Sequence, residues 1–85
     1  MSQWDKILRR VLSGQAEHNV RFADLCGLLL RLGFDERFRG DHYTFGKTSV
    51  CEIIDLQPLQ DGKAKAYQVK QVRALLRTYG LTKLP

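Results

Sequence analysis

The apolar residues of this chain change their spacing at Gly33, and this change constrains the fold more than any other feature of the sequence. From Phe22 to Leu32 they recur at helical intervals and fill one side of a helix. Gly33 suits the left-handed conformation that often ends a helix. From Phe34 to Arg39, one side of an extended chain carries both phenylalanines and the other side carries only charged residues. The chain is therefore expected to pass directly from an amphipathic helix into a strand.

Two more strands and a further core helix are expected after this strand. The turn signals at Gly40-Asp41 and at residues 46–49 are short enough to join antiparallel neighbours, so the three strands form a meander. A longer polar loop then leads to a helix with its own apolar stripe, from Gln68 to Tyr79. The second and third strands are expected at His42–Phe45 and Val50–Gln57.

The order of these elements predicts an α+β fold, α-β-β-β-α, with a three-stranded antiparallel sheet. A meander must cover its apolar face, and packing both helices on that one face is the simplest way to do so. This is the arrangement of double-stranded-RNA-binding domains. It would leave exposed a basic stripe on the last helix, made of Lys70, Arg73 and Arg77.

An extra N-terminal helix is expected before this core, from Trp4 to Leu12. Ser2 and Asp5 have the spacing of a capping box, and Gly14 suits the end of the helix. A chain of 85 residues is expected to form a single domain, 1–85. Within it, residues 1–21 would hold the N-terminal helix and a connector, and residues 22–81 the core.

The charges are distributed unevenly along the chain. The formal net charge is +5, and residues 62–85 contain six basic residues and no acidic one. This excess favours an anionic partner, either nucleic acid or the acidic surface of another protein. A solvated cationic helix face would have the same composition, so charge alone leaves the partner open.

Cysteine spacing and hydropathy argue against a zinc protein, a membrane protein and a secreted protein. Cys26 and Cys51 are not at zinc-ligand spacing and are expected to be buried, reduced thiols. The sequence has no cluster of carboxylates and histidines, so no metal or other cofactor is expected. It also has no apolar run long enough to span a membrane and no signal-peptide pattern near Met1, so the expected location is cytoplasmic.

His42 is the leading candidate for a catalytic residue. It follows the Gly40-Asp41 turn, near Arg39, and begins an aromatic strand. An imidazole titrates near neutral pH and can act as a general base, while neighbouring cations stabilise charge on a phosphodiester. RNA supplies its own nucleophile, the 2′-hydroxyl, so such a site needs no metal. The other interpretation of His42 is a hydrogen-bonded turn residue, and His18 is expected to be a surface residue.

Several patterns between Phe22 and Leu81 occur in a fixed order. They are Leu29-Leu30-Arg31-Leu32-Gly33-Phe34, then Arg39-Gly40-Asp41-His42-Tyr43-Thr44-Phe45, a strand, a lysine-bearing loop and a helix that ends in Tyr79-Gly80-Leu81. In this order they resemble the HicA family of messenger-RNA interferase toxins. The family pattern is a Leu-x-x-Leu-Gly-Phe helix end, followed by Gly-(Ser/Thr)-His and an aromatic or aliphatic strand.

The resemblance implies an activity, a catalytic residue and a partner. A HicA-like protein would be a toxin-type, metal-independent endoribonuclease of a type II toxin-antitoxin system that cleaves mRNA. His42 would be its catalytic residue, and a HicB-like antitoxin would cover the active site. Asp41 stands where the family usually has Ser or Thr. Its carboxylate would either orient the imidazole by accepting a hydrogen bond or repel the phosphate.

Phosphate contacts are expected near His42 and in the basic C-terminal segment. Lysines just before the last helix would act together with the amide groups at its N-terminus. Tyr43, Phe45 and Tyr67 are candidates for stacking on bases, with core packing as the other role for the first two. The candidates for RNA binding are Arg39, Gly40, Lys63, Lys65, Lys70 and Arg73.

Two other functions are consistent with the sequence. A non-catalytic RNA-binding module of the same fold would use the basic surface without His42. A small protein-interaction domain would use its basic face to meet an acidic partner.

Overall fold

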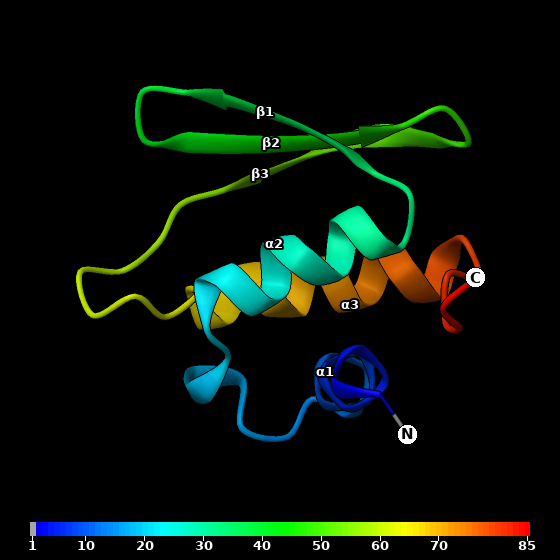
Figure 1. Ribbon diagram of the computed structural model, residues 1–85, viewed down its shortest axis with the longest axis horizontal. Helices are drawn as coiled ribbons and strands as arrows, with labels where there is room; N and C mark the ends of the chain where they lie inside the picture. The colour runs from blue at the N-terminus through cyan, green and yellow to red at the C-terminus, as the bar shows by residue number, and fades with distance from the viewer. Residues whose placement is uncertain (1) are drawn as a thin grey trace.

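The computed structural model describes residues 2–85, and Figure 1 shows how its helices and strands are arranged. The element bounds agree closely with the sequence-based expectation, apart from a short 3-10 helix, η1, in the connector. In chain order the elements are α1 (Gln3–Ser13), η1 (Glu17–Asn19), α2 (Phe22–Arg31), β1 (Asp35–Arg39), β2 (His42–Lys47), β3 (Val50–Leu56) and α3 (Ala66–Thr78).

The structure has three layers. The strands form one antiparallel sheet in the order β1-β2-β3, and α2 and α3 lie side by side beneath one face of it (Figure 1). Helix α1 lies below this helix pair, on the side away from the sheet. The α+β class, the α-β-β-β-α order and the placement of both core helices on one face are confirmed. Within residues 2–85, the other face of the sheet carries no helix.

The main core lies between the sheet and the α2–α3 pair. The sheet contributes Phe45, Ile54 and Leu56, which are all buried. Because side chains alternate between the two faces of a strand, these residues identify the inner face of the sheet. The helices meet them with buried residues that include Leu25, Leu28, Leu29, Val69, Val72 and Leu76.

Helix α1 docks through its apolar stripe and an unusually close contact. Ser2 and Asp5 form the expected capping box, and hydrogen bonds from Ser2 lower the pKa of the Asp5 carboxyl. Leu8 is buried, and the Trp4 ring lies directly over Gly27 of α2, where a Cβ atom would come within 2.3 Å of the ring. Gly27 therefore provides the space into which the indole fits.

The docking of α1 changes the surface that was expected on α3. Arg73 forms an ion pair with Glu17 of η1 and is only 19% exposed, while Arg77 donates a hydrogen bond to the carbonyl of Leu12. The expectation of a fully exposed basic stripe on the last helix is therefore wrong for Arg73. The N-terminal segment covers that part of the stripe, because the carboxylate of Glu17 pairs with the guanidinium.

The edge strand β3 is tied to α3 by side-chain hydrogen bonds. Buried Gln68 accepts from the backbone NH of Gln57 and donates to the carbonyl of Asp55. The hydroxyl of Tyr79 accepts from the NH of Cys51 and donates to the carboxylate of Glu52, a bond that raises the pKa of Tyr79. These bonds satisfy backbone groups of β3 and of Gln57, which follows it, along the edge where residues 2–85 provide no further strand.

The two cysteines differ in exposure. Cys26 is buried as expected, but Cys51 is exposed, so that prediction is wrong for Cys51. The reason is that Cys51 alternates with buried residues of β3 and falls on the outer side of the strand.

Among residues 2–85, no helix is both long and apolar enough to cross a membrane.

Candidate active site on the outer face of the sheet

The strand register brings polar side chains together on the uncovered face of the sheet. Arg39 pairs with His42 across β1 and β2, and Thr44 lies between Arg37 on β1 and Asp55 on β3. These positions alternate with the buried residues Phe45, Ile54 and Leu56, so their side chains project from the opposite, outer face. This outer face is the candidate site.

His42 stands at the start of β2, just after the hairpin turn. Gly40 has a φ of 64°, a left-handed conformation that a glycine adopts without strain, and it turns the chain back into β2. The imidazole Nδ1 lies 3.0 Å from Oδ1 of Asp55, and the side chain of His42 is 49% exposed. A carboxylate can only accept a hydrogen bond, so the proton of the neutral ring sits on Nδ1. The ring's other nitrogen, Nε2, then carries the lone pair.

Gln57 and Lys65 face this second nitrogen. Lys65 Nζ donates to Oε1 of Gln57 at 3.2 Å. An ammonium group has no lone pair, so the amide oxygen of Gln57 must face Lys65 and its NH₂ group must face His42. The amide nitrogen lies 3.2 Å from His42 Nε2, which agrees with Nε2 as an acceptor. The four side chains Asp55, His42, Gln57 and Lys65 thus form one connected chain of hydrogen bonds.

Asp41 lies on the same side of the ring as Gln57. Its Oδ1 is 3.7 Å from His42 Nε2, and its Oδ2 accepts from Gln57 Nε2 at 3.4 Å. The close bond to the imidazole is made by Asp55 at Nδ1, so Asp55 holds the position that orients the ring. Asp41 instead adds a second negative charge near Nε2.

A second set of bonds fixes the residues that contact His42. Gln68 of α3 is 5% exposed and binds the backbone of both Asp55 and Gln57. A buried polar side chain with two satisfied hydrogen bonds gives a rigid connection between α3 and the end of β3. The position of the Asp55 and Gln57 side chains is therefore coupled to the core.

The RNA-binding candidates divide into two groups in the structure. Arg39 lines a hollow of about 650 Å³ together with Arg37, Phe38, His42 and Thr44. Gly40 forms the adjoining turn, and Lys65 reaches the site through Gln57. These three residues lie with His42.

The other candidates lie elsewhere. Lys63 donates to the side chain of Asn19, in the region where the loop before α3 meets the connector. Lys70 is exposed on α3, which lies on the inner side of the sheet, and Arg73 faces η1. Among the aromatic candidates, Phe45 is buried in the core and Tyr43 packs between the rings of Phe22 and Phe38, whereas Tyr67 is 58% exposed.

Three residues of the site were missed at the level of sequence: Arg37, Asp55 and Gln57. Arg37 lies two residues before Arg39, and strand alternation alone would have placed both on one face. Asp55 and Gln57 could not be matched to His42 without the register of β2 and β3.

Among residues 2–85, no three His, Cys, Asp or Glu side chains gather in a way that could hold a metal ion.

The comparisons with known proteins leave the family unassigned. No protein-family model matches this chain, and no curated protein or solved structure matches it at a significant level.

Proposed function

We propose that the protein is a toxin-type endoribonuclease that cleaves mRNA without a metal, with His42 as the general base. The observation that carries the proposal is the state of the imidazole. Asp55 holds a proton on Nδ1, so Nε2 carries a lone pair; this nitrogen accepts from Gln57, has Asp41 nearby, and belongs to a ring that lines a hollow together with Arg37 and Arg39. The resemblance of residues 22–81 to the HicA family supports the same activity.

The chemistry uses the substrate's own nucleophile. Nε2 of His42 removes the proton of a ribose 2′-hydroxyl, and the 2′-oxygen attacks the adjacent phosphorus. The new O2′–P bond forms as the P–O5′ bond breaks, which leaves a 2′,3′-cyclic phosphate and a free 5′-hydroxyl. The 2′-hydroxyl takes the place that the Gln57 amide occupies at 3.2 Å from Nε2.

Asp55 and the cations assist different parts of this reaction. Asp55 stabilises the imidazolium that forms when Nε2 takes the proton, because its carboxylate lies 3.0 Å from Nδ1. Arg37 and Arg39 stabilise the negative charge that develops on the phosphate oxygens. The 5′-oxygen needs a proton as it leaves, and the ammonium group of Lys65, which is bonded to Gln57, is the nearest donor along the hydrogen-bond chain.

The proposed partner is an antitoxin of the HicB type that covers the outer face of the sheet. This face offers more than charge, since Ile53 is 65% exposed on it, while Phe38, which is 60% exposed and pairs with Tyr43 on the inner face, borders it at the edge strand β1. A protein that contacts these apolar side chains and pairs with Arg37 and Arg39 would exclude RNA from His42.

The test is RNA integrity during incubation with purified protein in EDTA. Wild type should shorten a single-stranded mRNA and leave products with 2′,3′-cyclic phosphate ends, whereas His42→Ala should leave the RNA intact. Both proteins should give the same circular dichroism spectrum and bind RNA at low salt. Intact RNA with wild type, under conditions where it binds, would overturn the nuclease proposal.

A second candidate function, RNA binding without cleavage, rests on Arg37 and Arg39, which occupy the outer face independently of His42. It predicts that wild type and His42→Ala retain RNA equally and that neither cuts it. Failure to retain RNA even at low salt would exclude both candidates, because phosphate-driven binding strengthens as salt falls.

A further inference from the structure

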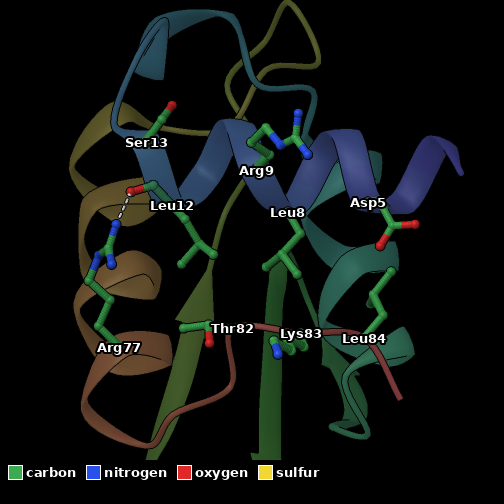
Figure 2. A pocket seen from close by; sticks show the side chains of 9 residues that line it. All are labelled: Asp5, Leu8, Arg9, Leu12, Ser13, Arg77, Thr82, Lys83 and Leu84. Carbon is green, nitrogen blue, oxygen red and sulfur yellow. Dashed lines mark hydrogen bonds between the residues drawn. The ribbon is translucent and has the colours of Figure 1, made fainter. Parts of the chain in front are cut away.

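A second surface, remote from the sheet, has the features of a protein-docking site. A hollow of about 870 Å³ opens between α1, the end of α3 and the last residues of the chain. Figure 2 shows α1 along one side and the segment 82–84 along the other, with side chains from both reaching into the space between them. Because α1 lies on the far side of the helix pair from the sheet, this hollow is separate from the site around His42 (Figure 1).

The floor of the hollow is aliphatic. Leu8 and Leu12 point from α1 toward the segment 82–84, and Leu84 reaches back toward α1 (Figure 2). Leu8 is buried, while Leu12 and Leu84 are only partly buried against the core. Apolar area thus remains open to solvent on these two leucines, and a ligand that covered it would gain hydrophobic stabilisation.

Cationic side chains outnumber acidic ones around the hollow. Its rim carries Arg9, Arg77 and Lys83, and none of these forms an ion pair within residues 2–85. The one acidic side chain in the lining is Asp5, whose carboxylate is already hydrogen-bonded to the backbone NH and the hydroxyl of Ser2. The lining therefore carries three cations and one carboxylate around an apolar floor, and the excess of charge is positive.

We propose that this hollow binds an acidic segment of a partner protein that carries leucine-like side chains. The aliphatic floor matches such side chains, and carboxylates on either side of them would meet the three cations. A nucleic acid fits less well, because the floor is aliphatic and no lining residue offers an aromatic ring on which a base could stack. The inference does not rest on the proposed nuclease activity.

The test uses a synthetic fluorescent peptide of glutamates with leucines at helical i, i+3, i+4 and i+7 spacing. Fluorescence anisotropy should show saturable binding to the full-length protein. Replacing the glutamates by glutamine, or the leucines by serine, should each weaken binding at least about tenfold. No saturable binding, or binding that ignores the leucines, would overturn the proposal.

Matched protein variants locate the binding. Arg9→Glu with Lys83→Glu should weaken the peptide at least about tenfold. Lys6→Glu with Arg10→Glu changes two cations of α1 that do not line the hollow, so the net charge changes equally and the affinity should fall less than about threefold. Equal losses in both pairs would show non-specific attraction by the net charge and would contradict the proposal.

Two further measurements separate the remaining outcomes. Leu84→Ser removes part of the floor near the end of the chain without a charge change and should weaken the peptide, with the thermal unfolding of each variant followed in parallel. An oligouridine RNA should not compete for the hollow. Competition that Arg9→Glu with Lys83→Glu abolishes would assign the hollow to nucleic acid instead. His42→Ala should bind the peptide as wild type does, whatever the result for RNA cleavage.

Discussion

The Asp55 carboxylate contacts one nitrogen of the His42 ring, and its replacement tests the proposed cleavage activity separately from RNA binding. We expect Asp55→Asn to lower the rate of RNA cleavage at least about tenfold, because an amide stabilises an imidazolium less than a carboxylate does. RNA affinity should stay the same or increase, since the variant removes a negative charge from a cationic face. Single-turnover cleavage assays and filter binding with the same RNA measure the two effects.

Asp41→Asn is the matched control for this prediction. It makes the same change of charge on the side of Nε2, where the carboxylate oxygen lies 3.7 Å from the ring. Its effect on the cleavage rate should be smaller than that of Asp55→Asn. The opposite order would identify Asp41 as the residue that orients His42.

The two cysteines should differ sharply in reactivity. Burial raises the pKa of the Cys26 thiol to about 12, with a smaller contribution from Glu36, while Cys51 is exposed. A raised pKa keeps the thiol protonated at pH 8, and only the thiolate reacts quickly. Titration with Ellman's reagent at pH 8 should therefore modify one thiol in the native protein and both in guanidinium chloride. Cys51→Ser should abolish the fast reaction; two fast thiols in the native wild type would contradict the assignment.

The sequence predicted part of this site and could not predict the rest. The Gly40-Asp41 turn and strand alternation were enough to place Arg39 beside His42. Asp55 lies 13 residues further along the chain from His42. Its position depends on a register shift between Phe45 and Lys47, where β2 departs from regular pairing. This shift changes by two residues which position of β3 lies opposite a given residue of β2, so spacing alone could not choose Asp55.

At the scale of the elements, the contact between α1 and α2 depends on the absence of a side chain at Gly27. A Cβ there would lie 2.3 Å from the Trp4 ring, closer than atoms pack. We expect Gly27→Ala to lower the free energy of unfolding by about 1–3 kcal/mol, because the ring must move, despite the higher helix propensity of alanine. Urea denaturation followed by circular dichroism measures this change.

The control for Gly27→Ala is the same substitution beside a smaller residue. In a Trp4→Leu background the added methyl group has no indole to contact. Gly27→Ala should therefore lower the free energy of unfolding less in this background than in wild type. Equal costs in the two backgrounds would show that the Trp4 contact does not limit this position.

The contact between Trp4 and Gly27 also shows what the sequence could and could not predict about the helices and strands. The helices and strands themselves follow from periodicity and from turn residues, which act locally. The docking of α1 could not be predicted in this way. An apolar stripe indicates that a helix packs against something, but it does not identify the surface. Gly27 and Arg31 do not belong to the apolar side of Phe22–Leu32, yet Trp4 packs over Gly27 and the Arg31 guanidinium lies 5.2 Å from the indole ring. Arg73 was expected to be exposed and is paired with Glu17.

At the scale of the whole molecule, the distribution of charge along the sequence differs from its distribution on the folded surface. The net positive charge comes from residues 62–85, but Arg37 and Arg39 of the uncovered sheet face belong to the balanced part of the chain. Folding buries most of the Arg73 side chain and brings Lys65 to the end of β3 through Gln57. A count along the sequence therefore indicates an anionic partner without locating the surface that binds it.

The salt dependence of RNA binding tests this location. The slope of log K against log salt for single-stranded RNA reflects the number of phosphates that the protein neutralises, at about 0.7 per contact. If RNA lies on the outer face of the sheet, Arg37→Gln and Arg39→Gln should each reduce the slope by about this amount. Arg31→Gln removes the same charge from α2, where the guanidinium faces Trp4, and should leave the slope unchanged. Equal reductions in all three variants would show that RNA responds to the total charge, and a reduction in Arg31→Gln alone would place RNA on the helical side of the molecule.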